Sequence, residues 1–326
     1  MELDINNFKT FQNPKAYTFE EVACYQCQSR SFSNLLIGQD DLTGRKGNFR
    51  YVTCKDCGLS YQNPRLDLDS VKEFYDNDYI AHRKKTDWGI LTPLYEWAMN
   101  KHDREKQKIV SRYLKFNEST EILDVGCAVG TFLAHMKKKH NCSASGIDFV
   151  DLSAHPNFSN INFYNGVFSE TQLPRAKFDL ITMWHFLEHD YKPAESLAKS
   201  YEALKPDGRL VIEVPRLDSF SYELFKERWP GVQAPQHTIL FNKNTFMKFI
   251  ESHNFEIVDY LPYGAFPSYF YLFMGAKFKK LQGRGVDLNK VIVPYFAGQL
   301  LLSPILLFEK YLNLSMQTIV CRKKSS

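Results

Sequence analysis

Residues 121–132 read EILDVGCAVGTF, and this stretch decides the fold. The apolar residues within 122–125 predict a buried parallel strand, Gly126 predicts a turn, and 131–133 predict the start of a helix. A strand that feeds a glycine turn and a helix N-terminus presents free backbone N–H groups, and Gly126 and Gly130 let a ligand approach the main chain. The stretch therefore predicts an α/β fold with a ligand at this edge of its sheet.

The glycine spacing separates two cofactor classes. GCAVG does not fit the GxGxxG fingerprint of dinucleotide-binding proteins. DVGCAVGTF resembles the first motif of the class I S-adenosylmethionine-dependent methyltransferases, usually DxGCGxGxF, and departs from it at Ala128. FDLITMWHFLEH (178–189) and LKPDGRLVIEVP (204–215) match later motifs of that family at their spacing. The resemblance implies a Rossmann-like seven-stranded sheet, binding of S-adenosylmethionine, and in-line transfer of its methyl group.

Further cofactor contacts follow from the same reading. The second strand is predicted over 143–148, where Asp148 would accept hydrogen bonds from a ribose diol, with a helix N-cap as the alternative. After the third strand (161–166) the family often has an aspartate that binds adenine, and here Val167 and Phe168 would hold adenine through their backbone. The candidate cofactor-binding residues are Asp124, Gly126, Cys127, Gly130, Asp148, Phe149, Val167, Phe168 and His185.

Four of the seven cysteines form two CxxC pairs. Cys24 with Cys27, and Cys54 with Cys57, can bring four thiolates around one zinc ion, because each pair places two sulfurs on one side of a tight turn. Four cysteine ligands leave no open coordination position, so we expect a structural site that supplies folding free energy. Disulfides and a redox dithiol are the alternatives.

Order along the chain predicts five regions. The CxxC pairs, YQNPR and YDNDY resemble a zinc-ribbon-bearing, methyltransferase 23-like branch of the family. We expect a zinc ribbon (1–66), a helical linker or lid (67–118), the Rossmann-like domain (119–262), an apolar helical insertion (263–313) and a final strand (314–326). Within these regions, helices are predicted near 68–75 and 88–116, with at most one helical turn around Pro156. A further helix over 192–205 is expected to be closed by residues 205–208, before a fifth strand over 209–214. The last two strands are predicted over 255–261 and 316–322.

Composition limits the partners and the compartment. The formal net charge is +4, which is no electrostatic footprint for duplex nucleic acid. The first twelve residues, MELDINNFKTFQ, show no secretory signal, so we expect a cytoplasmic protein. Residues 291–308 carry no charge. For them we expect a packed helical insertion over the acceptor site or a homo-oligomer interface, with peripheral membrane contact, and least of all a membrane span, as alternatives.

Candidate catalytic residues follow the fourth strand (178–185). His185, Glu188 and His189 fall in the turn where a bound methyl donor would present its methyl group, and they could polarise an acceptor or bind a divalent ion. HFLEH is similar to the ExxEH metal motif of ubiquinone-pathway O-methyltransferases, with His185 replacing the first glutamate. Capping and packing are the structural alternative. His237 is a further candidate base or acceptor ligand, with a satisfied loop histidine as its alternative.

These observations predict an enzyme. We expect methyl transfer from S-adenosylmethionine to a small-molecule or glycan acceptor, at oxygen, in a protein that also holds structural zinc. One alternative is an RNA or protein methyltransferase that uses the ribbon for recognition. Another is a non-catalytic scaffold that binds S-adenosylmethionine, because Ala128 and Val167 both depart from the family pattern.

Overall fold

A computed structural model describes residues 17–75, 89, 92–306 and 308–324 of the chain. The expectation about a signal in the first twelve residues lies outside the described residues. So do YDNDY beyond Tyr75 and most of the first turn of the helix predicted over 88–116.

The main sheet has seven strands in the order β12-β13-β10-β9-β6-β7-β8. The strands from β8 to β10 are parallel to one another, and β13 lies antiparallel to both of its neighbours. This order confirms the predicted Rossmann-like methyltransferase sheet. Its strands are β6 (Glu121–Val125), β7 (Ser143–Asp148), β8 (Asn162–Asn165), β9 (Phe178–Trp184), β10 (Leu204–Pro215), β12 (Phe255–Leu261) and β13 (Met316–Lys323).

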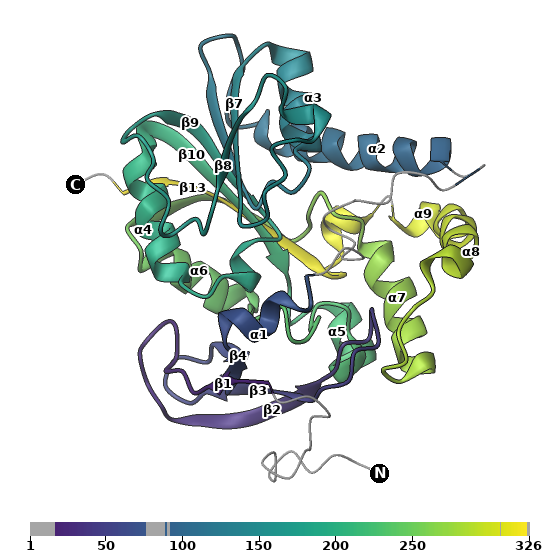
Figure 1. The fold of residues 1–326 in the computed structure, drawn as a ribbon. Coiled ribbons are helices and arrows are strands. Elements are labelled where there is room, and N and C mark those ends of the chain that lie inside the picture. Colours follow the sequence, from purple (N-terminus) through teal and green to yellow (C-terminus); the bar gives the residue numbers. More distant parts are fainter. Residues whose placement is uncertain (1–16, 76–88, 90–91, 307, 325–326) are drawn as a thin grey trace.

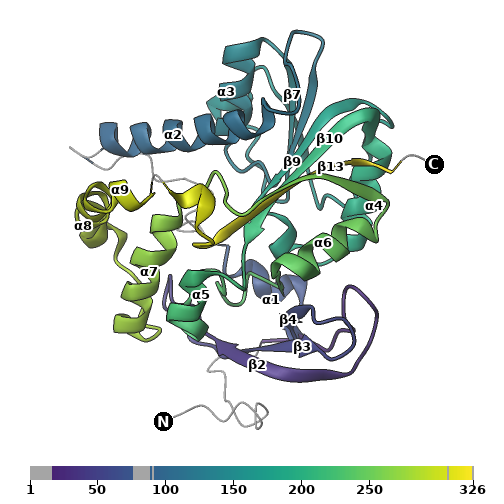
Figure 2. The same cartoon turned by 180° about the vertical axis from the view of Figure 1, so that it is seen from behind.

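Helices cover both faces of this sheet (Figures 1 and 2). On one face, α2 (Thr92–Val110) and α3 (Thr131–His140) contribute buried apolar side chains that pack on β6 and β7. On the other face, α4 (Pro193–Ala203) and α6 (Lys243–Glu251) do the same against β9 and β10. Because each helix presents one apolar stripe to the sheet, both faces of the sheet are covered. A ligand can therefore reach the sheet only at the ends of its strands.

Two local predictions can be compared with the structure. The crossover after β7 holds a single 3-10 turn, η4 (Pro156–Phe158), as the proline and polar residues of that segment predicted. The prediction that residues 205–208 close a helix was wrong, because α4 ends at Ala203 and β10 begins at Leu204. The pairing of β10 with β9 shifts register between Leu204 and Arg209, so this segment forms an irregular start of the strand.

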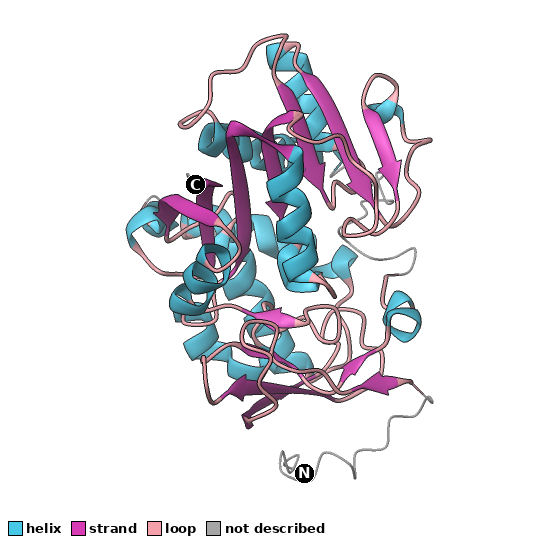
Figure 3. Cartoon of the chain, turned by 90° about the vertical axis from the view of Figure 1, so that its left-hand side faces the viewer, coloured by secondary structure: helices cyan, strands magenta, loops and turns pink. Residues whose placement is uncertain are grey.

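The N-terminal part forms its own small sheets (Figure 3). One has four strands in the order β11-β4-β3-β2. Its outer strand, β11 (Ile239–Leu240), belongs in sequence to the main domain, between β10 and β12. β11 pairs with β4 through Tyr61 and Ser60. The N-terminal part is therefore joined to the main domain by main-chain hydrogen bonds. Its other elements are β1 (Phe19–Glu20), β2 (Phe32–Gly38), β3 (Phe49–Cys54), β4 (Ser60–Gln62), β5 (Arg65–Leu66) and α1 (Leu68–Lys72).

A helical segment lies between β12 and β13. Its first helix packs well, because Tyr271, Met274 and Phe278 are buried. The next helix, α8, is mostly exposed, and Leu300 and Leu301 are 76% and 79% exposed. No helix among the described residues is long and apolar enough to cross a membrane. The helices are α5 (Phe220–Phe225) with η6 (Lys226–Arg228) before β12, and α7 (Ser268–Leu281), α8 (Leu288–Leu301), α9 (Ser303–Leu306) and η7 (Glu309–Tyr311) after it.

Exposure of α8 bears on the expectation for residues 291–308. In this helix Ile292 is buried, whereas Val293, Leu300 and Leu301 face solvent. The stretch is thus packed on one side only. Homo-oligomer formation and peripheral membrane contact through it stay predictions.

Candidate functional site

Every second residue of the turn between β6 and α3 has a positive φ angle. Gly126, Ala128 and Gly130 have φ angles of 70°, 47° and 67°. A Cβ on Gly126 would lie 2.9 Å from the Phe186 ring, and one on Gly130 would lie 2.7 Å from the Phe158 ring. Two positions therefore need glycine for space as well as for conformation. Ala128 adopts the same strained conformation with a side chain, which explains why the family pattern has glycine there.

Replacing Ala128 with glycine is expected to stabilise the protein by about 1 kcal/mol, because glycine adopts a positive φ without steric cost. Ala134→Gly is the matched control, since Ala134 lies within α3. There the same change is expected to destabilise by about 1 kcal/mol. Urea unfolding of both variants measures the two free energies. Shifts of the same sign in both variants would contradict this account of the turn.

Two aspartates flank this turn. Asp148 is buried, and its carboxylate accepts hydrogen bonds from the N–H of Ala128 (3.0 Å) and from the N–H of Val150 (3.0 Å). These bonds hold the carboxylate at the edge of the turn, and they take the place of the helix N-cap that was the alternative. Asp124 accepts a hydrogen bond from the Thr182 hydroxyl at 2.6 Å. Burial raises the pKa of Asp124 to about 6, against the opposing charge of Lys106.

Some of the candidate cofactor-binding residues line a cavity, and the others do not. Asp124, Gly126, Cys127 and His185 line one cavity at the carboxyl ends of the parallel strands. The other candidates lie outside this lining. Phe149 and Val167 are partly exposed on the surface, whereas Phe168 is buried in the core, edge-on to Phe186. The structure thus brings the glycine turn and the end of the fourth strand to one cavity. The predicted adenine contacts, Val167 and Phe168, are not part of its lining.

His185 follows β9 directly and has a φ of 55°, which is unusual for a residue with a side chain. Its Nδ1 lies 3.5 Å from Glu188 Oε1, and its Nε2 lies 3.1 Å from Glu213 Oε1. Burial alone would lower the pKa of His185, but the two carboxylates outweigh burial and raise it to about 9. At neutral pH the His185 side chain is therefore an imidazolium, which favours donating a hydrogen bond over accepting a proton.

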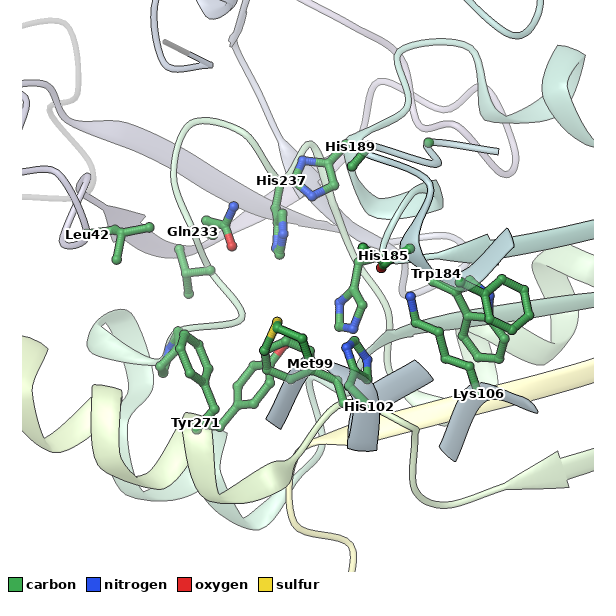
Figure 4. Close-up of a pocket in the computed structure, with 18 of the residues that line it drawn as sticks. Leu42, Met99, His102, Lys106, Trp184, His185, His189, Gln233, His237 and Tyr271 are labelled. Atoms are coloured by element: carbon green, nitrogen blue, oxygen red, sulfur yellow. The ribbon is translucent and has the colours of Figure 1, made fainter. Parts of the chain in front are cut away.

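Glu188, His189 and His237 meet although they come from two distant segments. Figure 4 shows the His189 and His237 side chains side by side. The rings of His189 and His237 are 4.4 Å apart between centroids and nearly perpendicular. His237 Nδ1 lies 2.8 Å from the carbonyl oxygen of Gly231, so Nδ1 carries the proton and Nε2 is unprotonated. Burial lowers the pKa of His237, which keeps the ring neutral. His185 and His237 are therefore expected in opposite protonation states.

Main-chain contacts position His237 against Glu188. The N–H of Thr238 donates to the carbonyl oxygen of Glu188 at 2.7 Å. From the N-terminal sheet, the Tyr51 hydroxyl donates to the carbonyl oxygen of His237 at 2.7 Å and lies 3.1 Å from that of Val232. The N-terminal sheet thus fixes the loop that carries His237.

The rest of the cavity wall is aromatic and partly supplied by the N-terminal part. Trp184, Phe266, Phe270 and Tyr271 contribute rings from the main domain and α7. Polar groups come from the loop after β2, at residues 39–41, and from Gln233. Asp41 of this loop is held by Arg228 in a buried ion pair of 2.6 Å. The cavity therefore extends from the glycine turn to a region that is lined by both aromatic rings and polar groups.

The four predicted zinc ligands also come together. Cys24 Sγ lies 3.4 Å from Cys57 Sγ, and Cys27 Sγ lies 3.5 Å from Cys54 Sγ. All four sulfurs lie within 4.8 Å of one another, and all four thiols are free. A tetrahedral site with Zn–S bonds of about 2.3 Å needs sulfurs roughly 3.8 Å apart. The cluster therefore fits zinc, and its spacing is too long for disulfides.

Comparison with known proteins identifies the main domain. Residues 99–260 match a family model described as a methyltransferase domain. Residues 99–260 are a methyltransferase domain of this family. The match confirms the family and the enzyme class that the motifs predicted. A protein of Mycolicibacterium smegmatis named "probable S-adenosylmethionine-dependent methyltransferase" is 23% identical over 150 residues, which are 43% of this chain. The chain spans about half of that relative, 54% of its length.

Solved structures with similar folds have low sequence identity. The 1,6-didemethyltoxoflavin-N1-methyltransferase of Burkholderia thailandensis, with bound 1,6-didemethyltoxoflavin and S-adenosylhomocysteine, is 16% identical. The similarity covers 83% of this chain and 98% of that chain, with a TM-score of 0.45. The [4+2]-cyclase SpnF is also 16% identical, with a TM-score of 0.47, and covers 69% of this chain and 81% of its own.

Two residues of the methyltransferase domain's cavity region were missed in the sequence. Glu213 is fully buried on β10, where its carboxylate accepts hydrogen bonds from the N–H groups of Ala265 (2.6 Å) and Phe266 (3.2 Å). An acid within the apolar run RLVIEV was the signal that could have found it. Lys106 lines the cavity from α2, with its ammonium 5.4 Å from the Trp184 ring. Helix α2 carries several charged residues, and nothing in the sequence indicated that Lys106 is buried whereas others of them are solvated.

Proposed function

We propose that this methyltransferase domain transfers a methyl group from S-adenosylmethionine to a hydroxyl of a small-molecule or glycan acceptor. One observation carries the proposal: the glycine turn and the histidine cluster line the same cavity. The N–H groups of Gly126 and Cys127 donate to the carbonyl oxygen of Ile147, so the turn would hold the cofactor through close contact along its cavity-lining main chain and not through these donors. The histidines lie where an acceptor would meet the methyl group. Proximity of the two reactants is the main requirement, because the sulfonium methyl is already activated.

The lining supports an acceptor with both flat apolar faces and hydroxyl groups. Trp184, Phe270 and Tyr271 offer rings on which a sugar or an aromatic ring can stack. Gln39, with the two aspartates that follow it, offers hydrogen-bond acceptors and an amide at one end of the cavity. Such a mixture of rings and hydrogen-bonding groups suits a glycan or a hydroxylated small molecule.

The charges of the residues around the cavity suggest a different role for each. Lys106 is the positive group near the glycine turn, and we assign it to the carboxylate of the methionine moiety. His237 is neutral and its Nε2 makes no hydrogen bond with any described residue, so it can receive or polarise the proton of the acceptor. His185 lies between the Glu188 and Glu213 carboxylates, and Glu188 Oε1 lies 4.0 Å from His237 Nε2, so we assign His185 to positioning Glu188 beside His237.

For the cysteine cluster we propose structural zinc. The four thiols fit a tetrahedral site, and all four ligand positions are filled by protein sulfur. Zinc at Cys24, Cys27, Cys54 and Cys57 would hold β3 and β4 in place, and through Tyr51 it would hold the loop that carries His237.

Calorimetric titration of the zinc-loaded protein with S-adenosylmethionine tests the proposal, and saturable binding is expected. Asp148→Ala is expected to weaken binding about 10- to 100-fold, because a hydrogen bond to a charged group contributes about 1.5–3 kcal/mol. Asp151→Ala is the control, since Asp151 is exposed three residues away and bonds only within its own turn, to Ser153. Unchanged affinity in Asp148→Ala would refute the ribose role. Absence of binding to the parent protein would overturn the methyltransferase proposal.

A methyl-transfer screen then identifies the acceptor class. Nucleotide sugars, lipid-linked glycans, quinone precursors and RNA are incubated with labelled S-adenosylmethionine, and the methylated product is located. Transfer to a hydroxyl of a glycan or small molecule is the expected result. Transfer only to RNA or protein would replace the proposed acceptor, and cofactor binding without transfer to any class would favour the scaffold.

A further inference from the structure

Glu188, His189 and His237 form a second group of possible metal ligands, separate from the cysteine cluster. One ligand atom from each lies within 4.8 Å of the others. Glu188 and His189 belong to η5 (Leu187–His189), and His237 belongs to the loop before β11. Zinc-like bond lengths of about 2.1 Å place ligand atoms roughly 3.4 Å apart, so small side-chain rotations bring these three atoms to metal-binding spacing.

The Glu188 carboxylate indicates a missing cation. Glu188 is 1% exposed, and neither of its oxygens accepts a hydrogen bond from any described residue. The shorter of its two ion-pair contacts is with His185, whose Nδ1 lies 3.5 Å away and whose Nε2 lies closer, at 3.1 Å, to Glu213. One imidazole ring is therefore shared between two buried carboxylates. Since a buried carboxylate without full compensation costs several kcal/mol, an additional positive charge beside Glu188 would stabilise the site.

Both histidine rings are held in place by hydrogen bonds. His237 donates its Nδ1 proton to Gly231, which leaves the Nε2 lone pair facing Glu188 Oε1 at 4.0 Å. A ligand histidine commonly has its other nitrogen bound to a backbone carbonyl in this way, because the bond fixes the ring and its tautomer. His189 Nδ1 lies 2.9 Å from the Tyr75 hydroxyl, which orients that ring as well.

We propose that Glu188, His189 and His237 bind one divalent first-row transition-metal ion. This two-histidine, one-carboxylate set suits such ions and leaves coordination positions open. His189 and His237 line the cavity, so an open position can take the acceptor hydroxyl. The proposal rests on the proposed function for this last role, and binding of the ion itself does not depend on it.

The metal would lower the pKa of the bound hydroxyl, as it does for water. With its Nε2 lone pair bound to the ion, His237 would hold the metal instead of acting as the base. The acceptor O–H bond then breaks and its proton passes to water in the cavity. The oxygen lone pair forms the new bond to the methyl carbon while the bond from sulfur to that carbon breaks. Sulfur keeps the electron pair, which gives neutral S-adenosylhomocysteine and the methyl ether. No oxidant or reductant takes part.

Cobalt(II) titration of the zinc-loaded full chain tests the site, with visible absorption as the readout. One equivalent is expected to bind and to give ligand-field bands without the strong thiolate charge-transfer band that cobalt in the cysteine cluster would give. Glu188→Gln and His237→Gln are each expected to weaken binding at least about tenfold. His253→Gln is the matched control, because His253 Nδ1 also lies against a backbone carbonyl, that of Phe249, away from the cavity. It is expected to bind cobalt as the parent does.

Three outcomes would overturn the proposal: no saturable binding in the zinc-loaded parent, bands from thiolate ligation alone, or parental affinity in both variants. Circular dichroism shows whether each variant is folded. Should His237→Gln fail to fold, Glu188→Gln decides alone, since the Glu188 side chain accepts no hydrogen bond from described residues. Neither S-adenosylmethionine nor acceptor is present in this titration. Failure to bind cobalt therefore leaves the methyltransferase proposal standing, and failure to bind S-adenosylmethionine leaves the metal site standing.

Discussion

Substitution of Cys54 by serine is expected to destabilise the protein by more than about 3 kcal/mol. Structural zinc sites contribute about 10–16 kcal/mol of folding free energy in small peptides, and one missing thiolate removes much of it. Cys54 is the last residue of β3, and its Sγ lies 3.5 Å from Cys27 Sγ. Its replacement therefore removes one of the four sulfur ligands. Zinc content and thermal unfolding of the purified variant measure the effect.

Cys142→Ala provides the control for this substitution. Cys142 is buried beside α3, on the far side of the main sheet from the cysteine cluster, so the change removes a sulfur without touching the four thiols. Its expected cost is about 1 kcal/mol, from a small cavity. If Cys54→Ser kept one zinc per chain and the melting temperature of the parent, the zinc proposal would be wrong.

Glu213→Ala is expected to cost about 3–5 kcal/mol, the range measured when one partner of a buried ion pair is removed. The carboxylate has no exposure to solvent, and its removal leaves the N–H groups of Ala265 and Phe266 unsatisfied and His185 less compensated. Urea unfolding gives the free energy. Glu213→Gln is expected to cost less, because the amide oxygen can still accept one of the two backbone hydrogen bonds.

The matched control is Glu256→Ala on β12, at the edge of the same sheet. Glu256 pairs with Arg322 at 3.0 Å, but both side chains are nearly half exposed. An exposed pair of this kind contributes about 0–1 kcal/mol. Equal losses in Glu213→Ala and Glu256→Ala would show that burial of the Glu213 carboxylate does not set its importance.

Local patterns were sufficient for the main sheet. The strand at 121–125, the glycine turn and the helix after it follow from apolar periodicity and from residues that tolerate positive φ. The broken crossover followed from Pro156. Such features depend on neighbours in sequence, so one sequence contains the information they need.

Long-range pairing could not be read in the same way. β11 is two residues long, and it is a strand only because β4, far away in sequence, pairs with it. Glu188 and His237 were both candidates, but their meeting depends on Thr238 bonding to the turn that carries Glu188. Glu213 was missed because its donors belong to a loop more than fifty residues further along the chain.

Burial of the apolar helix α8 was another limit. The eighteen-residue uncharged stretch 291–308, which includes most of α8, predicted packing, but a run that is apolar on all sides does not indicate which side is covered. In the structure α7 takes most of the buried rings, and Leu300 and Leu301 are left outside.

The pairing of β11 with β4 would couple the proposed zinc site to the proposed acceptor site. Tyr51 and β4 belong to the cysteine-rich part and bond to the segment that carries His237, so an ion that orders the first would also order the second. Thermodynamic reciprocity then applies: whatever factor zinc adds to acceptor affinity, the acceptor adds to zinc affinity. Loss of zinc would therefore lower the affinity for the acceptor first, while the conformation of the glycine turn between β6 and α3 stays the same.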